Sequence, residues 1–308
     1  MLSKALFTPD SSSSDPFWSS SAEVIFQDIV TYLVDKNHLS LEKLNNMIAK
    51  IDIKKLGSKL KNTYSSVYLD PSNEKTAASI RSTLATNTKA LRYLPEKGDY
   101  PFIFREWVKS ISEQNNQDTH NKGPFLFLSA SPENRDLMRP LLSMWMDIIA
   151  SSIMSLGPNS KRRIWMIIDE LPALKKIPSL ITALSEFRKY GGCIMTGLQS
   201  INQLYKIYGQ HDAYTMLDQF DTKFIFRTED HNFANYICKN FGEIEYTESS
   251  ENISYGANEM RDGVSLSKIE RRKLLVTPSD LASLEPCQCY VSLPEPEVRA
   301  AKVKMEFV

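Results

Sequence analysis

The sequence predicts an α/β protein in which an all-helical module precedes a doubly wound, largely parallel sheet. In the first third of the chain, apolar residues recur at helical spacing and no strand pattern is convincing. Further on, short apolar runs alternate with amphipathic stretches, which is the strand–helix rhythm of a doubly wound sheet. With 308 residues, the chain is long enough for two domains or one large one.

Three regions are expected along the chain. Residues 1–16 are polar and rich in serine, and should form a loop or a truncated edge. Residues 17–98 should form the all-alpha domain, and residues 99–308 the α/β domain. The boundary near residue 98 is placed where helical periodicity gives way to short apolar runs.

Helices in the all-alpha domain are predicted from their apolar faces. The first lies in AEVIFQDIVTYLVDK (22–36), and the second in LSLEKLNNMIAKI (39–51), with Ser40 as a suitable N-cap. A third helix should span about 74–94, after the turn signal DPSN (70–73).

The α/β domain is expected to begin with two extended pieces, PFIFREWV (101–108) and PFLFLSAS (124–131). A long amphipathic helix follows over about 132–156. RIWMIIDE (163–170) is a continuous apolar run that ends in acids, which predicts a strand buried on both faces of a parallel sheet.

The alternation continues with a helix over about 179–190 and the strand CIMTG (193–197). Another helix and the strand KFIFR (223–227) follow. The polar stretch 245–273 should be an ordered loop or a hairpin, and CQCYVSL (287–293) one further strand.

Composition narrows the class of protein. Hydrophobic residues make up 42% and charged residues 24%, with a formal net charge of zero, so nucleic-acid contact would need a local patch. No run approaches the ~20 apolar residues that cross a bilayer, and no signal peptide is evident.

The four cysteines, Cys193, Cys238, Cys287 and Cys289, lack the spacing of a zinc site, so we expect reduced thiols and a cytoplasmic chain.

Asp169 and Glu170 are the leading candidates for catalysis. They follow the apolar run Trp165–Ile168, and ligands of open α/β sheets bind at the carboxyl ends of strands. One carboxylate there can hold Mg²⁺, directly or through water, while the next orients an attacking water, which is the Walker B arrangement. The alternative is an acid that only caps the following helix.

Two later residues strengthen the catalytic interpretation. Arg188 ends the helix after the acids, and Gln199 follows the next strand. Alone, Arg188 is a favourable cation at a helix C-terminus and Gln199 an ordinary loop amide. Together with the acids, they would surround one phosphate site, the amide sensing the γ-phosphate and the arginine stabilising charge on a neighbour's nucleotide.

The stretch RRIWMIIDELPALKKIPSL…LSEFRKYGGCIMTGLQSINQLYKIYG resembles the TraD family of conjugative coupling proteins, which are hexameric DNA translocases of type IV secretion. Further matches are DPFW (15–18), SYGANEMRDGVS (254–265) and CYVSLPEP (289–296). The resemblance implies a RecA-like P-loop NTPase sheet, present here incompletely, into which the all-alpha domain is inserted.

The resemblance also implies roles and partners. Asp169 and Glu170 match the Walker B acids, Gln199 the family's glutamine motif, and Arg188 a trans-acting arginine. ATP and Mg²⁺ are the implied cofactors, with Asp169 holding the metal through water and Gln199 contacting the γ-phosphate. DNA, a homohexamer, the relaxosome and channel proteins are the implied partners, at the cytoplasmic face of the bacterial inner membrane.

The sequence contains no G-x-x-x-x-G-K-[ST] segment, whose backbone amides and lysine would cradle phosphates. The resemblance implies that the intact protein is an ATPase, and the missing motif predicts that this chain is inactive alone, so that a partner segment must supply the loop.

A lysine-rich stretch in the all-alpha domain is a candidate DNA-binding surface. Lys54, Lys55 and Lys59 lie in it, with Tyr64 and Tyr68 just beyond, and phosphate attraction plus ring stacking is typical of nonspecific strand binding. A simply solvated helix surface is the alternative.

Two other functions remain open at this point. One is a noncatalytic remnant that binds DNA or secreted cargo through the helical domain. The other is a different RecA-like translocase, such as a chromosome-segregation (FtsK-like) or HerA-type pump.

Overall fold

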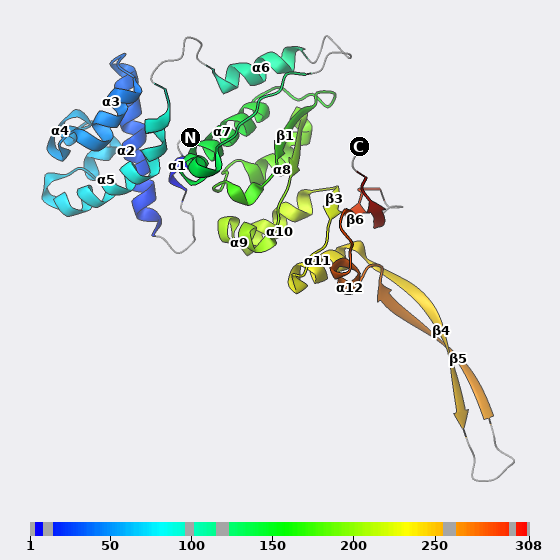
Figure 1. Ribbon diagram of the computed structural model, residues 1–308. Helices are drawn as coiled ribbons and strands as arrows, with labels where there is room; N and C mark the ends of the chain where they lie inside the picture. The colour runs from blue at the N-terminus through cyan, green and yellow to red at the C-terminus, as the bar shows by residue number, and fades with distance from the viewer. Residues whose placement is uncertain are drawn as a thin grey trace. The chain divides into compact units, whose positions relative to one another are not determined.

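The computed structural model describes residues 4–8, 15–95, 102–114, 123–254, 263–295 and 300–306 (Figure 1). The chain divides into two compact units, Met1–Leu217 and Asp218–Val308, which are described separately. No described helix is long and apolar enough to cross a membrane.

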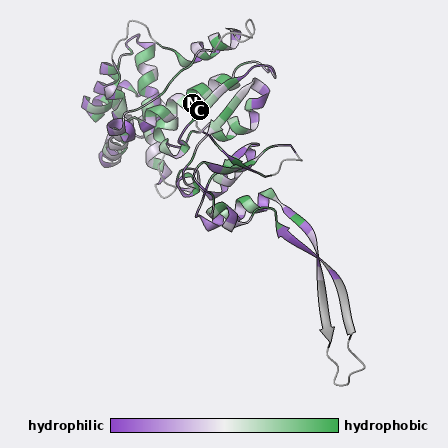
Figure 2. Cartoon of the chain, turned by 45° about the vertical axis from the view of Figure 1, so that its right-hand side comes forward, coloured by the Kyte–Doolittle hydropathy of each residue, from purple (hydrophilic) through white to green (hydrophobic). Residues whose placement is uncertain are grey.

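Unit 1 begins with a cluster of short helices. They are α1 (Lys4–Phe7), α2 (Pro16–Asp35), α3 (Leu41–Asn45), the π-helical turn η1 (Asn46–Lys50), α4 (Ile53–Lys59), the 3₁₀ turns η2 (Tyr64–Val67) and η3 (Pro71–Asn73), α5 (Glu74–Thr88) and the 3₁₀ turn η4 (Lys89–Tyr93). Hydrophilic and hydrophobic stretches alternate along them, as expected of amphipathic helices around one core (Figure 2).

The helix predictions in this region are confirmed. Ser40 is the N-cap of α3, and its side chain accepts a hydrogen bond from Lys43 N at 3.2 Å. The third predicted helix is α5 with its continuation η4. Within the segment expected as a loop, α1 buries Ala5, Leu6 and Phe7. The domain boundaries at residues 16 and 98 stay a prediction.

Helix α7 (Arg135–Met154) links the helical core to the sheet of unit 1. Leu141 belongs to the helical core, and Leu137, Met138 and Trp145 pack against it. α7 is preceded by the 3₁₀ turn η5 (Pro132–Asn134) and packs against α6 (Phe104–Gln114) and α8 (Leu180–Tyr190).

The extended structure predicted for PFIFREWV is wrong, because α6 begins at Phe104. Val108 and Ile111 follow Phe104 at helical spacing and are buried, and the Phe104 ring lies 5.9 Å from that of Trp145. The second piece, PFLFLSAS, forms neither helix nor paired strand within the described residues.

Among the residues of unit 1 that the structure describes, two parallel strands form a sheet. β1 (Ile164–Ile168) pairs with β2 (Gly192–Thr196) in parallel, and α8 connects them, as predicted. The 3₁₀ turn η6 (Leu171–Ala173) follows β1, and helices α9 (Ile201–Tyr208) and α10 (Gln210–Gln219) follow β2.

Burial of β1 on both faces was predicted, and this is wrong for the described structure. Ile164, Met166 and Ile168 are buried, but Trp165 is 61% and Ile167 63% exposed. Met195, opposite Ile167 on β2, is 56% exposed. No described segment of unit 1 covers this apolar face, although parallel sheets are normally covered on both sides.

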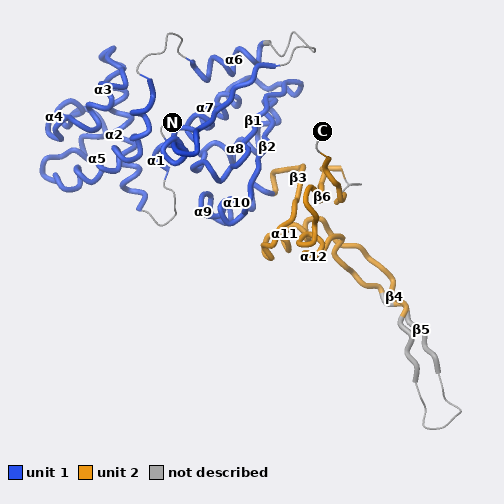
Figure 3. The backbone as a smooth tube through the Cα atoms, in the orientation of Figure 1, with its two compact units in different colours: residues 1–217 blue, residues 218–308 orange. Residues whose placement is uncertain are grey.

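Unit 2, drawn in orange in Figure 3, is built on an antiparallel sheet of order β3-β6-β7. The strands are β3 (Lys223–Ile225), β6 (Gln288–Ser292) and β7 (Ala301–Lys304), and helices α11 (His231–Phe241) and α12 (Pro278–Ala282) accompany them. The strands predicted in KFIFR and CQCYVSL are therefore confirmed, but they pair with each other antiparallel.

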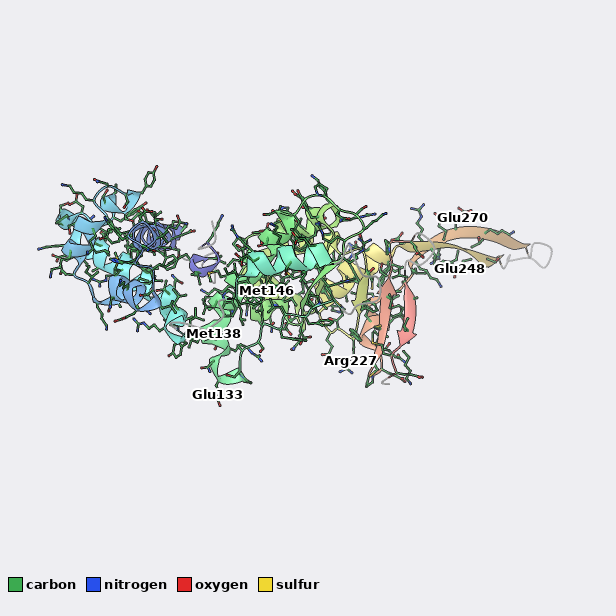
Figure 4. The ribbon with its side chains drawn as sticks, turned by 90° about the horizontal axis from the view of Figure 1, so that it is seen from above. Glu133, Met138, Met146, Arg227, Glu248 and Glu270 are labelled. Atoms are coloured by element: carbon green, nitrogen blue, oxygen red, sulfur yellow. The ribbon has the colours of Figure 1, made fainter. Side chains whose placement is uncertain are left out.

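A long hairpin extends from unit 2. β4 (Glu243–Ser254) pairs antiparallel with β5 (Gly263–Leu274), which confirms the hairpin alternative for the polar stretch. Glu248 lies on one strand and Glu270 on the other (Figure 4). Arg271 Nε lies 2.7 Å from Glu248 Oε2, and Arg272 Nη2 lies 2.7 Å from Glu245 Oε1, so ion pairs link the two strands.

Candidate functional site

The candidate site lies at the carboxyl edge of the β1–β2 pair. Ile168 is opposite Thr196 at the strand ends. The pairing continues beyond them, because Gly197 N donates to Ile168 O at 2.8 Å and Leu171 N donates to Gly197 O at 2.9 Å. The residues that follow each strand therefore meet at one edge of the sheet, where α/β proteins bind ligands.

Gly197 allows the two chain segments to touch. A Cβ atom at this position would overlap the carbonyl oxygen of Asp169, so the position requires a residue without a side chain. Gln199 follows two residues later on the same segment. The structure thus brings the segment of Asp169 and Glu170 together with the segment of Gln199.

The two acids differ in their surroundings. Asp169 is exposed, whereas Glu170 is partly buried. Glu170 Oε1 is fully buried and has no hydrogen-bond partner. A buried carboxylate oxygen without a hydrogen bond is unfavourable in free energy unless it binds a cation, a water or another hydrogen-bond donor. This site therefore fits a hydrated Mg²⁺ or an attacking water.

No group of three or more His, Cys, Asp or Glu residues is placed to hold a metal in the part of the chain that the structure describes. Two adjacent carboxylates alone make a weak cage. Mg²⁺ is usually bound by one or two carboxylates together with substrate phosphates and water, so the pair Asp169–Glu170 suits a metal that arrives with a nucleotide.

Arg188 lies at the other end of the sheet. It occupies the last turn of α8, is exposed, and precedes Gly191, whose carbonyl accepts from Ile164 N at the start of β1. The structure therefore does not bring Arg188 to the acids of its own chain. Its expected action on a neighbouring subunit stays a prediction.

The lysines of the candidate DNA-binding surface lie on α4. Asp52 caps this helix by accepting from Lys54 N at 2.9 Å and Lys55 N at 3.3 Å. The side chains of Lys54, Lys55 and Lys59 are exposed, and Lys59 Nζ lies 5.5 Å from the ring centre of Tyr32. Tyr64, in the next turn, is 85% exposed.

The loop that leaves the acid pair is held from α9 and α10. Ile177 N donates to the Tyr208 hydroxyl at 3.2 Å, and Lys176 Nζ lies 3.1 Å from Asp212 Oδ2. Burial raises the pKa of Tyr208 to about 12; the Ile177 amide lowers it, and the nearby charge of Asp147 raises it further. Tyr208 is therefore a neutral, structural hydroxyl at physiological pH.

The pKa of Tyr208 predicts a loss of stability in alkali. The folded-state pKa lies above the ordinary value of 10.0, so the stabilisation is complete below pH 10 and is lost as the pH rises toward 12. We expect the free energy of unfolding to fall by on the order of 2 kcal/mol over this range through Tyr208 alone. Tyr208→Phe should be less stable at pH 8, because Ile177 N loses its acceptor.

Urea unfolding of both proteins between pH 8 and 11.5 checks this prediction. Taking the difference between the two cancels the titration of other groups, and it should shrink as the pH rises. A difference that stays constant with pH would contradict the assignment.

Sequence reasoning did not identify Gly197, Tyr208 or the polar residues of α7 that contact this loop. Gly197 carried a usable signal, because a glycine directly after an apolar strand often marks a close approach of two backbones. Tyr208 carried none, since its partner is a backbone amide 31 residues away.

Comparison with known proteins places the chain in a family. A sequence model described as "Type IV secretion-system coupling protein DNA-binding domain" matches residues 1–306. The chain belongs to this family of coupling proteins. Membership excludes the alternative of a chromosome-segregation or HerA-type pump.

Among coupling proteins, the chain is 36% identical over 301 residues to "Coupling protein TraD" of Escherichia coli (strain K12). That match covers 97% of this chain and 41% of TraD. It is 26% identical over 155 residues to "Protein VirD4" of Agrobacterium fabrum, covering 50% of this chain and 23% of VirD4. This coupling-protein chain therefore spans less than half of the length of these relatives.

Solved coupling-protein structures share the fold. "Bacterial conjugative coupling protein TrwBdeltaN70" in its unbound form superposes with a TM-score of 0.80 and 26% identity, over 99% of this chain and 67% of that one. TrwB in complex with ADP and Mg²⁺ superposes with a TM-score of 0.78 and 25% identity, over 99% and 66%. The predicted fold class, a RecA-like sheet with an all-helical domain, is confirmed.

Proposed function

We propose that this chain is the acid-bearing part of an ATP-driven DNA translocase, a coupling protein that delivers relaxase-bound DNA to a type IV secretion channel. The observation that carries the proposal is the shared edge of β1 and β2, where Asp169 and Glu170 adjoin the segment of Gln199. The nucleotide complex of TrwB, with the same fold, supports ATP and Mg²⁺ as the cofactors.

The environment of each side chain suggests its task. Asp169 is exposed and would hold Mg²⁺ through water, whereas the partly buried Glu170 would orient the attacking water. Gln199 is exposed and would contact the γ-phosphate. When bound, Mg²⁺ neutralises charge on the phosphates. Arg188 would act on the nucleotide of the adjacent subunit.

The phosphate cradle would come from a segment outside this sequence, here called the P-loop segment. The sequence holds no G-x-x-x-x-G-K-[ST], and a third of the solved TrwB chain has no counterpart in the match. The exposed face of Trp165, Ile167 and Met195 offers the apolar surface on which such a segment would pack.

We also base the proposed domain organisation, assembly and location on the family of coupling proteins. Residues 17–98 would be the all-alpha domain and residues 99–308 the motor part. The complete protein would form a homohexamer at the cytoplasmic face of the inner membrane and receive its substrate from the relaxosome.

Reconstitution tests the proposal. The P-loop segment encoded immediately upstream of this chain, or that of TraD if none is found there, would be added to the chain as a separate polypeptide. We expect no substantial ATP hydrolysis by either part alone, and DNA-stimulated hydrolysis by the mixture. A stable, DNA-bound complex without hydrolysis would instead favour a noncatalytic binding protein.

The exposed lysines of α4 favour DNA binding under both of these functions. Replacing Lys54, Lys55 and Lys59 with Glu should weaken binding of single-stranded DNA about tenfold or more at low salt and reduce the salt slope by about 2, because phosphate contacts are lost. Electrophoretic shifts or anisotropy across salt concentrations measure both quantities.

The matched control makes the same charge change in unit 2. Lys239, Lys302 and Lys304 are also exposed, and their replacement with Glu should leave the salt slope unchanged. Equal losses in the two triple variants would mean that only net charge matters and that α4 is not a DNA-binding surface.

A further inference from the structure

One face of α7, a mostly apolar helix, carries three polar residues that share one set of partners. Arg139, Ser143 and Asp147 are four residues apart, so they lie in a row along the helix. Ser143 is fully buried and Asp147 is 5% exposed. Buried polar residues persist where they satisfy other buried polar groups, so their partners indicate what the row does.

All three residues bind the backbone of the loop between the acid pair and α8. Arg139 Nη2 donates to Leu174 O at 2.9 Å and to Pro172 O at 3.2 Å. The Ser143 hydroxyl accepts from Lys175 N at 2.8 Å, and Asp147 Oδ1 accepts from Ser179 N at 2.8 Å. In chain order, the backbone partners are Pro172, Leu174, Lys175 and Ser179.

This loop is anchored at apolar residues and only partly exposed between them. Leu171, Ile177 and Leu180 are at most 1% exposed, and Leu174, Lys175 and Ser179 are partly buried, so much of the loop packs against protein. Tyr208 of α9 accepts a further bond from Ile177 N, and Asp212 of α10 accepts one from Lys176 Nζ. After the short 3₁₀ turn η6, side chains of α7, α9 and α10 thus help to set the course of the chain.

We propose that Arg139, Ser143 and Asp147, the α7 polar row, are positioning residues for the candidate acid pair. The inference rests on the proposed function. Leu171 N is tied to Gly197 O, directly after Glu170, and the row fixes the loop from Pro172 onward. Loosening the row lets the turn at Leu171 move, and with it the two carboxylates.

Ser143→Ala and Ser152→Ala form a matched pair of variants. Both serines are buried in α7 and donate to the carbonyl four residues earlier, Ser143 to Arg139 O and Ser152 to Ile148 O. The structure shows Ser143 also accepting a bond from the loop. Loss of that bond in Ser143→Ala should therefore reveal positioning, while Ser152→Ala reports any general weakening of the helix.

Hydrogen exchange of the 308-residue chain provides the first measurement. In Ser143→Ala, the amide of Lys175 should exchange about tenfold faster, and the amide of Leu171 several-fold faster, than in Ser152→Ala. Asp147→Ala should act similarly through Ser179. Asp147→Asn keeps an oxygen acceptor and should restore slow exchange, which excludes an effect of charge alone.

Turnover by the chain assembled with the P-loop segment provides the second measurement. Ser143→Ala and Asp147→Ala should lower kcat for MgATP about tenfold, since small displacements of catalytic groups are costly, and leave KM within about twofold. Ser152→Ala and Asp147→Asn should behave as the parent. A purely structural role would instead reduce the folded fraction and leave kcat per folded molecule unchanged.

The outcomes separate the two proposals. Equal Leu171 exchange in Ser143→Ala and Ser152→Ala, or an unchanged kcat in Ser143→Ala, overturns the positioning role and leaves the proposed function standing. If the parent assembly hydrolyses no ATP, the proposed function fails, and Leu171 exchange alone then decides whether the row controls the turn after the acids.

Discussion

Asp169→Asn should lower ATP turnover by the chain assembled with the P-loop segment about 100-fold or more. Asp169 is the exposed acid at the shared edge of β1 and β2, where a carboxylate can hold a hydrated metal. Asparagine has the same shape and lacks the charge. The variant should therefore also bind nucleotide with a weaker dependence on Mg²⁺, which fluorescence of a labelled nucleotide measures without hydrolysis.

Glu170→Gln separates the second role from the first. Glu170 has one fully buried oxygen, and its expected task is to orient the attacking water. This variant should bind MgATP as the parent does and lose turnover to a similar extent. Weakened nucleotide binding in Glu170→Gln, with normal binding in Asp169→Asn, would reverse the assignment of the two acids.

Two controls guard against indirect effects. Glu186 is an exposed acid on α8, and Glu186→Gln should leave turnover unchanged. Removal of the exposed charge of Asp169 should change the free energy of unfolding by less than about 0.5 kcal/mol. Full activity in both Asp169→Asn and Glu170→Gln would exclude the motor function at this edge.

Local sequence patterns predicted the part of the site that is formed by the residues directly after β1 and β2. An apolar strand followed by two acids, a helix and a second apolar strand leaves little choice of topology, because a crossover through a helix brings the second strand in parallel to the first. Asp169 and Gln199 were therefore expected at one edge. Arg188 lies at the opposite edge, because a crossover helix runs back, and its action on the nucleotide of a neighbouring subunit stays a prediction.

Contacts made across long stretches of chain were not predictable in this way. Ser143 and Asp147 bind backbone amides 32 residues away, and no sequence pattern marks such amides. The available hint was that Arg139, Ser143 and Asp147 recur every four residues in the mostly apolar helix α7. The exposure of Trp165 and Ile167 was equally hidden, since an apolar run predicts a strand but cannot say which polypeptide covers it.

Gly197→Ala should disturb both the fold and the site. The new Cβ would overlap the carbonyl oxygen of Asp169, and a backbone atom in a paired strand end has no easy escape. The two segments must separate, which strains the bonds that Gly197 makes to Ile168 and Leu171. We expect the free energy of unfolding to fall by about 2 kcal/mol or more, and turnover with the P-loop segment to fall about tenfold beyond the loss of folded protein.

Gly157→Ala is the matched control, because a Cβ there would meet no atom within 4 Å. Urea unfolding of the chain alone compares the two variants, and hydrogen exchange at Leu171 shows whether the strand ends have parted. Since no nucleotide is needed for either measurement, the result bears on the structure of the edge independently of any activity. If Gly197→Ala is as stable as Gly157→Ala and protects Leu171 equally, then the close contact of Gly197 with Asp169 does not hold the acids in place. The two strand ends would then be held by the hydrogen bonds of Leu171 and Gly197, and a larger residue at position 197 could be accommodated without moving them.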